Sequence, residues 1–315
     1  MICTKNNKCK TIAKVFFASV LVFLLIISVD WQQVWNYVVD ANWWLIALSA
    51  VFYLLGIFIS SRKWQILAQF KKFNKKYPFY FKTYLLGTFI NNFLPSFVGG
   101  DTYRSYALGT GEKRIVESSS TVIIDRISGL VSVMALAIVL SFTQFDTLKE
   151  YNLIIFIILG LVAVFVGIII VVVASKHSSA QKVTKYIPKT VRKYLEYLVV
   201  FHHTDIMPRA MGYAFLFDFV GIAIANYLLF LAIGVELTFV QFLSVVFLTN
   251  IIASIPVSVG NIGIKEWAYV FLFGIFGVGG SAAVTVVILA RVLQMLVSLV
   301  AIPFYLQNKK TLQHK

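Results

Sequence analysis

Charged residues are scarce in this chain, and acidic residues are the scarcest of all. Only 13% of the 315 residues are charged, whereas 59% are hydrophobic. Several apolar runs approach or exceed the roughly 20 residues that a helix needs to cross a bilayer. This composition predicts an all-α polytopic membrane protein that forms a single domain over residues 1–315.

Cysteine is almost absent, and the chain offers no set of metal ligands. Cys3 and Cys9 both lie in the N-terminal tail, which we place in the cytoplasm, so no disulfide framework is expected. His202 and His203 have no cysteine partners at metal-site spacing, which favours an interfacial role. We therefore expect neither a metal nor a cofactor.

Recognisable catalytic motifs are also missing. The sequence contains no G-x-S-x-G, no H-E-x-x-H, no Walker A motif and no dinucleotide fingerprint. No soluble segment is long enough to form a separate catalytic domain. The sequence alone therefore predicts that the chain is not an enzyme.

Positive charge is what the chain does have, with 28 Lys and Arg against 13 Asp and Glu and a net charge of +15. These basic residues lie in short loops that border the apolar runs. The positive-inside rule explains such loops as cytoplasmic, so no nucleic-acid partner is expected. The loops also favour a multi-pass protein of the cell (inner) membrane, with both termini in the cytoplasm.

The apolar runs predict six spans: residues 11–29, 43–60, 121–141, 153–174, 211–233 and 281–304. We interpret the first span as an uncleaved signal anchor. The first half of the domain covers about 11–174, a cytoplasmic linker about 175–209, and the second half about 210–305. If 239–255 and 267–279 cross completely, the count rises to eight, so we expect six to eight transmembrane helices.

The segment 83–106 decides the topology. It contains FINNFLPSFVGGDTYR, in which Pro95 and the pair Gly99-Gly100 end an apolar helix. If this segment crossed the membrane, the basic loop after residue 174 would lie outside, against the positive-inside rule. The segment is therefore predicted to be a re-entrant helical hairpin that opens to the cytoplasm.

A second copy of this pattern follows in PVSVGNIGIKEW. Both copies read P-x-x-V-G-x-x-x-x-[KR], so that Pro256 corresponds to Pro95, Gly260 to Gly99 and Lys265 to Arg104. The spans before the two copies run in opposite directions. These features predict two re-entrant helical hairpins in an inverted repeat, with broken helices that meet near the midplane.

Ionisable groups at membrane depth are costly and usually functional. The candidate headgroup site combines these groups with the residues of the two turns: Asn92, Pro95, Gly99, Gly100, Asp101, Arg104, Asp125, Arg126, Pro256, Gly260, Gly263, Lys265, Glu266 and Arg291. Arginine offers bidentate geometry to a phosphate. The alternative is that Asp101–Arg104 and Lys265–Glu266 are structural ion pairs. Asp218 either belongs to a functional site or lies near the end of its span and reaches the membrane–water interface.

The same motifs resemble the lysylphosphatidylglycerol synthase transmembrane-region family of flippase-like membrane proteins. The resemblance covers nearly the whole chain and rests on FLPSFVGGDTYR, DRISG and IPVSVGNIGIKEW. The family pattern of an Arg followed by a Gly falls on Arg126 and Gly129. Asn261 stands where the family commonly has glycine. The aminoacyl transferase domain of larger relatives is not found in this sequence.

The resemblance implies that the chain moves a lipid between leaflets. An anionic phospholipid or a polyprenyl-phosphate-linked lipid would enter between the hairpins, with Arg104 and Arg126 on its phosphate and Lys265 on the other face. Such lipids feed envelope and glycan assembly, so envelope-synthesis enzymes are possible partners. Two alternatives remain open: a membrane subunit of a lipid-modifying transferase, such as one for lysylphosphatidylglycerol synthesis, and a scaffold that transports nothing.

Overall fold

The computed structural model describes residues 16, 18–93, 99–151, 155, 159–160, 162–163, 206–254 and 261–304. Over these residues the chain is helical and has no strand, which confirms the predicted all-α class. Four helical spans are long and apolar enough to cross a membrane: Trp43–Phe70, Ile115–Leu148, Ile206–Ala232 and Gly280–Phe304. They confirm a polytopic membrane protein.

A fifth span results if Ala18–Ser28 and Trp31–Val39, which are bent by 80° at a break, count as one. The second of these helices, α2 (Trp31–Val39), occupies a stretch expected to be a loop. It forms because the Asp30 carboxylate accepts hydrogen bonds from the backbone N–H groups of Gln32 and Gln33. The expected span 153–174 and the linker 175–209 lie almost wholly outside the described residues. The count of six to eight therefore stays a prediction.

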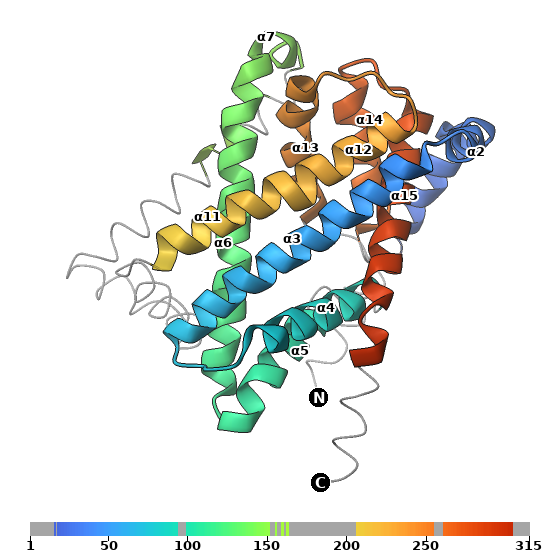
Figure 1. Cartoon of the computed structure of the whole chain (residues 1–315). Helices are drawn as coiled ribbons and strands as arrows, with labels where there is room; N and C mark the ends of the chain where they lie inside the picture. Colours follow the sequence, from blue (N-terminus) through green and yellow to red (C-terminus); the bar gives the residue numbers. More distant parts are fainter. Residues whose placement is uncertain are drawn as a thin grey trace, which may run out of the picture.

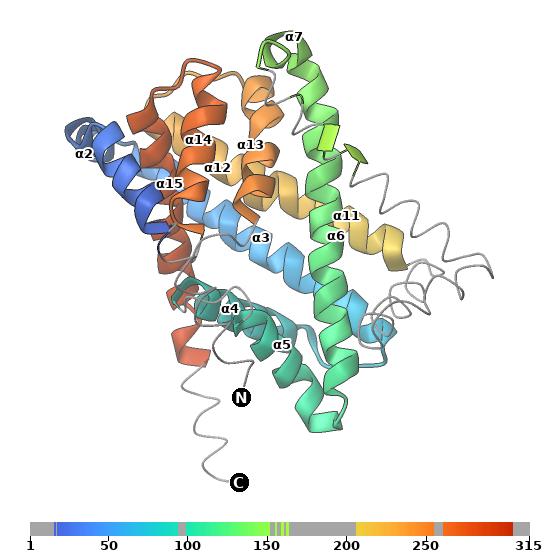
Figure 2. The same ribbon diagram turned by 180° about the vertical axis from the view of Figure 1, so that it is seen from behind.

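Two long helical segments cross the molecule side by side (Figures 1 and 2). One is α3 (Trp43–Phe70). The other consists of α11 (Ile206–Phe217), the π-helical segment η4 (Asp218–Ile224) and α12 (Ala225–Ala232). Their backbones touch at Gly56 and Gly221, because a Cβ built on Gly56 would lie only 2.7 Å from Gly221 Cα. The two halves of the chain thus meet directly in the middle of the structure.

Each predicted hairpin contains a pair of antiparallel helices, and the residues that join the two helices lie outside the described part of the chain. The first hairpin is α4 (Tyr77–Phe93) with α5 (Gly99–Gly109), and the second is α13 (Phe239–Ser254) with α14 (Ile264–Gly274). Figure 1 shows the first at the bottom of the molecule and the second at the top. Opposite placement is what an inverted repeat predicts. Re-entry of each hairpin into one leaflet stays a prediction.

Each hairpin is followed by a long helix that runs away from it. After the first come η1 (Thr110–Glu112), α6 (Ile115–Ser141), η2 (Phe142–Gln144) and α7 (Phe145–Leu148); after the second comes α15 (Gly280–Leu299). Helix α6 begins before the expected residue 121. Helix α3 continues beyond the expected residue 60, because no Pro or Gly interrupts residues 57–70. Arg62 and Lys63 therefore lie on a helix and not in a loop.

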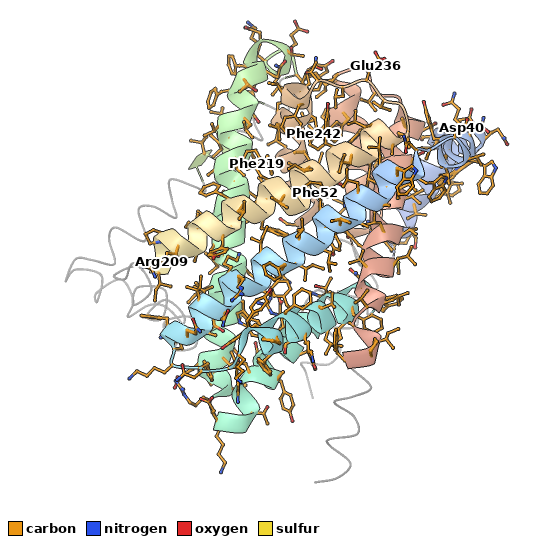
Figure 3. All side chains as sticks on the ribbon, in the orientation of Figure 1. Asp40, Phe52, Arg209, Phe219, Glu236 and Phe242 are labelled. Atoms are coloured by element: carbon orange, nitrogen blue, oxygen red, sulfur yellow. The ribbon has the colours of Figure 1, made fainter. Side chains whose placement is uncertain are left out.

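The largest core lies among α12–α15 and the facing part of α6. Phe230, Phe242 and Phe273 are 0% exposed and contact one another at ring-centroid distances of 4.6–5.8 Å. Figure 3 shows Phe242 among these helices. Trp43 and Trp44 are instead 61% and 85% exposed at the start of α3. Exposed tryptophans at a helix end are typical of a membrane-interface belt.

We expect the two hairpins to open to opposite sides of the membrane. Thr110 follows the first hairpin and Thr238 precedes the second, and both are exposed. Single cysteines at these positions, in a chain whose Cys3 and Cys9 are replaced by serine, should react with a membrane-impermeant thiol reagent from opposite sides. Labelling of both from one side would contradict the inverted arrangement.

Candidate functional site

Helices α3, α5 and α6 bring five charged side chains together, and we call this group the first cluster: Lys63, Asp101, Arg104, Asp125 and Arg126. Asp125 forms its centre, since its Oδ2 accepts from Arg104 Nη2 at 2.7 Å and its Oδ1 lies 3.1 Å from Lys63 Nζ. All three of these side chains are at most 4% exposed. Together they form a buried charged network that links the first hairpin to α3 and α6.

The outer part of the first cluster is more accessible. Arg126 Nε and Nη2 donate to the two oxygens of Asp101 at 2.8 and 2.9 Å, which is a bidentate ion pair. The Arg126 side chain is 54% exposed and that of Asp101 is 21% exposed. Arg126 is thus the cation of this cluster that an arriving anion meets first.

Arg104 is held from all sides. Its guanidinium carbon lies 4.4 Å from the Trp64 ring centroid and 4.1 Å from that of Tyr84. Its Nη1 lies 3.4 Å from Asp101 Oδ1. Cation–π contacts and ion pairs of this kind fix a desolvated guanidinium. In this conformation Arg104 positions Asp101 and Asp125, and at 2% exposure its side chain is closed off from the surroundings.

The position of Arg104 depends on the close packing of α4 against α5. A Cβ on Gly100 would lie 2.0 Å from the Gly87 carbonyl oxygen, so only glycine fits at this crossing. The Gly100 N–H donates to Asn91 Oδ1 at 2.8 Å, which satisfies a free amide at the start of α5. Asp101 lies in that first helical turn, where the helix dipole favours a carboxylate.

The second hairpin carries another group, the second cluster, made of Asn261, Gly263, Lys265, Glu266 and Arg291. Glu266 Oε1 accepts from Arg291 Nε at 2.8 Å, and Glu266 Oε2 accepts from the Gly263 N–H at 2.7 Å. Arg291 Nη2 donates to the Asn261 carbonyl at 3.0 Å. Asn261 has φ of +57°, a region that favours glycine and tolerates Asn, which explains how it replaces the family's glycine.

The two clusters repeat one arrangement. In each, a carboxylate in the first turn of the hairpin's second helix pairs with an arginine of the following helix, and the two residues are 25 positions apart. The pairs are Asp101–Arg126 and Glu266–Arg291. This repeated pair extends the motif-level correspondence seen in the sequence, and it relates α6 to α15.

Lys265 does not form the ion pair with Glu266 that was considered as the alternative. Glu266 pairs with Arg291 and not with Lys265, because neighbouring helical residues point in different directions. Lys265 Nζ lies 5.7 Å from the centroid of the Tyr269 ring, and no ion pair within the described residues involves it, although Glu266 and Arg291 are near enough to interact with its charge. The alternative of a structural Lys265–Glu266 ion pair is therefore not found among the described residues, and the Lys265 ammonium has no carboxylate partner there.

Each cluster has one positive charge more than it has carboxylates. The first has three cations and two carboxylates, and the second has Lys265 and Arg291 against Glu266 among the described residues. A single phosphate or phosphodiester would balance either excess. Anion binding is thus the chemistry that this arrangement supports.

The structure describes two of the remaining predicted site residues, Asn92 and Gly99. Asn92 Nδ2 donates to the Gln294 carbonyl at 3.1 Å and so joins the first hairpin to α15. Gly99 begins α5. Pro95, Pro256 and Gly260 lie outside the described residues.

Sequence reasoning missed Lys63, Trp64 and Tyr84. Lys63 was counted among the loop residues that orient the protein, although it is 3% exposed and its Nζ also donates to the Asp125 carbonyl at 2.9 Å. The sequence did contain one clue, since no Pro or Gly interrupts residues 57–70. The helix can therefore continue through Lys63, which lies on its buried face with Trp64 and Leu67.

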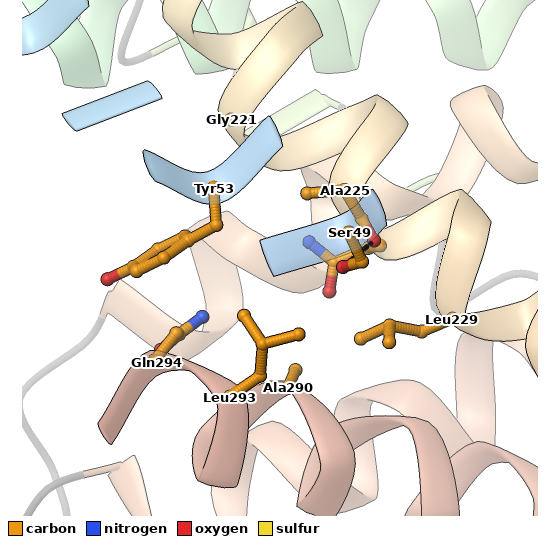
Figure 4. Close-up of a pocket in the computed structure, with 9 residues that line it drawn as sticks. Ser49, Tyr53, Gly221, Ala225, Leu229, Ala290, Leu293 and Gln294 are labelled. Atoms are coloured by element: carbon orange, nitrogen blue, oxygen red, sulfur yellow. Dashed lines mark hydrogen bonds between the residues drawn. The ribbon is translucent and has the colours of Figure 1, made fainter. Parts of the chain in front are cut away.

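A small opening of about 10 Å³ lies between α3, η4, α12 and α15 (Figure 4). Its polar lining comes from Ser49, Tyr53, Asn226 and Gln294. Because Gln294 also binds Asn92, this opening adjoins the contact between the first hairpin and α15. It joins residues of both halves of the chain.

Comparison with known proteins agrees with this architecture. The family described as the lysylphosphatidylglycerol synthase TM region matches residues 11–301. A UPF0104 membrane protein of Pyrococcus horikoshii is 25% identical over 297 residues, which cover 85% of this chain and 88% of that protein. No solved structure matches the chain significantly. The chain is therefore a multi-pass membrane protein that belongs to the lysylphosphatidylglycerol synthase transmembrane-region family.

Proposed function

We propose that the protein moves a lipid with an anionic, phosphate-bearing headgroup between the two leaflets of the cell membrane. The observation that carries this proposal is the repeated carboxylate–arginine pair, Asp101–Arg126 and Glu266–Arg291, on hairpins at opposite ends of the molecule. Each pair lies in a cluster with one surplus cation. A headgroup phosphate would replace the carboxylate as partner of the arginine.

The lipid tails need no site of their own in this mechanism. The acyl or polyprenyl chains remain in the bilayer while the headgroup moves between the two clusters. Arg126, which is half exposed, receives the phosphate at one end, and Lys265 with Arg291 receives it at the other. Flippase-like members of this family suggest the same class of activity, and the proposal describes a carrier and not an enzyme.

The distribution of exposed charge supports an orientation. Figure 3 shows Asp40 and Glu236 towards the end that carries the second hairpin, whereas Arg209 lies nearer the other end. The positive-inside rule then puts the first hairpin at the cytoplasmic face, with both chain termini on that side. Cytoplasmic lipid would reach Arg126 first.

Arg126→Gln and Lys265→Gln are each expected to slow lipid exchange by about 10- to 100-fold, because each removes one charge-assisted contact to phosphate. The measurement is leaflet exchange of a fluorescent anionic phospholipid in proteoliposomes that contain the full chain. Lys149→Gln is the matched control, since Lys149 is half exposed and pairs only with the exposed Asp146.

Wild-type exchange rates in Arg126→Gln and Lys265→Gln would contradict the assignment of these residues. Equal exchange of anionic and zwitterionic phospholipids by the wild type would contradict the anionic headgroup. A covalently altered lipid in the same vesicles would instead favour the lipid-modifying alternative.

A further inference from the structure

Asp218 is a fully buried carboxylate at the centre of the bundle. Its exposed fraction is 0%, and neither carboxylate oxygen has a hydrogen-bond partner within the described residues. It opens the π-helical segment η4, and π-helical turns are frequent at functional sites. An ionised carboxylate without partners is prohibitively costly in such a place, so its charge must be neutralised.

The polar side chain beside Asp218 is Ser132 of α6. Ser132 is also 0% exposed, and its Oγ likewise has no hydrogen-bond partner of good geometry in the described part of the chain. Buried polar groups are nearly always satisfied in native proteins. Ser132 lies near enough to donate to one carboxylate oxygen of Asp218, but the other oxygen and the negative charge would still have no partner. This remainder points to a small cation that both side chains would contact.

Few charged groups face this position. Lys63 of α3 is close enough to interact with Asp218 electrostatically, but its Nζ is engaged by Asp125. Asp125 of α6 and Arg209 of α11 are about two helical turns or more away along their helices. The described helix α13 has no titratable residue. Apart from Lys63, the ligand would meet no competing charge.

We propose that Asp218 and Ser132 form a binding site for a monovalent cation, either a proton or Na⁺, in the centre of the helix bundle. A proton would sit on a carboxylate oxygen of Asp218 and be donated to Ser132 Oγ as a hydrogen bond. Na⁺ would be coordinated by the carboxylate and by that same Oγ. Either ion neutralises the carboxylate and satisfies both side chains.

A space about the size of one water molecule lies near this site. Gly221, one helical turn after Asp218, lines that opening between α3, η4, α12 and α15 (Figure 4). Its volume of about 10 Å³ admits roughly one water. Ser49 and Asn226, which also line it, bring oxygen and nitrogen atoms to the junction of the two halves.

The site would also control the first cluster, a step that rests on the proposed function. With the cation bound, Asp218 is neutral and Lys63 remains with Asp125. When the cation leaves, the ionised Asp218 competes for Lys63, and the surplus positive charge near the cluster is cancelled. Headgroup affinity would then fall, which couples cation release to lipid release.

The binding site itself can be tested without transport, by the thermal unfolding midpoint of the purified full chain in detergent. If the ligand is a proton, the folded chain carries one proton more than the unfolded chain above the pH of about 3.9 at which a free Asp ionises. Stability then falls as pH rises, by about 2–4 °C per pH unit through the range where the folded site still holds its proton. If the ligand is Na⁺, the midpoint instead rises by about 2–4 °C per tenfold increase in Na⁺ over choline at constant ionic strength.

Asp218→Asn should abolish whichever response the wild type shows. Asp146→Asn is the matched control, because Asp146 is 93% exposed, and it should keep that response. If Asp218→Asn does not fold, Ser132→Ala tests the same site and should weaken the response, whereas Ser132→Thr should retain it. A wild type that responds to neither ion, or variants at Asp218 and Ser132 that respond as the wild type does, would overturn the proposal.

Lipid exchange separates this inference from the proposed function. A cation response that requires Asp218, in a protein that exchanges no lipid, would support the site and refute the transport function. Lipid exchange that continues at the wild-type rate in Asp218→Asn would refute the coupling and leave the transport function standing.

Discussion

Arg104→Ala is expected to lower the free energy of unfolding by about 3–5 kcal/mol, the cost of removing one partner from a buried ion pair. The substitution leaves Asp125 with Lys63 as its remaining charged partner among the described residues, at 2% exposure. It also removes the guanidinium that lies over the Trp64 and Tyr84 rings. Equilibrium unfolding of the purified protein in mixed micelles, followed by tryptophan fluorescence, measures the change.

Arg114→Ala provides the comparison for Arg104→Ala. Arg114 also pairs with two carboxylates, Glu112 and Glu117, but these side chains are 31–35% exposed. Exposed pairs contribute at most about 1 kcal/mol. Arg114 also donates to the Lys71 carbonyl and lies over the Phe73 ring, so this variant should lose some stability but less than Arg104→Ala. Equal losses in the two variants would show that the buried network contributes no more than a surface pair. A double-mutant cycle of Arg104→Ala with Asp125→Ala isolates their mutual interaction.

Gly100→Ala should destabilise the protein by about 3 kcal/mol, at the upper end of overpacking effects. The new methyl group would lie 2.0 Å from the Gly87 carbonyl oxygen, 2.7 Å from the Gly87 carbonyl carbon and 2.8 Å from Asn91 Oδ1. Two of these atoms are backbone, so α4 and α5 must move apart. That movement displaces Asp101 from Arg126, and lipid exchange should be lost together with stability.

Gly111→Ala is the control for Gly100→Ala. Gly111 lies in the short turn after α5, and nothing lies within 4 Å of a Cβ placed there. Both the unfolding midpoint and the lipid exchange rate should match those of the wild type. If Gly100→Ala behaved like Gly111→Ala, the close crossing of α4 and α5 could not be what positions the first cluster.

Much of the fold could be predicted from the sequence because membrane helices can be recognised as long apolar runs. The spans that begin at Trp43 and Gly280 follow from apolar length alone, and the separation of α4 from α5 and of α13 from α14 follows from helix-breaking residues. The helix limits were harder to predict. A run such as SSRKWQILAQF is polar enough to resemble a loop, yet its packing against α6 keeps it helical.

The residues of the candidate site could be predicted better than the ion pairs that they form with one another. The sequence singles out Asp101, Glu266 and Arg291 as ionisable groups at membrane depth, but adjacency in the chain suggested the wrong partner for Glu266. The real partner is 25 residues away on another helix. Such choices depend on how helices pack, which no local pattern encodes. Lys63 was missed for the same reason, since only packing reveals which face of α3 is buried.

The contact between Gly56 and Gly221 has a mechanical consequence. The two helices touch there through backbone, with the Phe217 ring beside both glycines, so few side chains interlock at that point and rotation about it needs little repacking. Such a contact acts as a fulcrum for the two halves of the chain. Small angular changes there become large displacements at the distant hairpins, while Asp218, only one turn from the fulcrum, hardly moves.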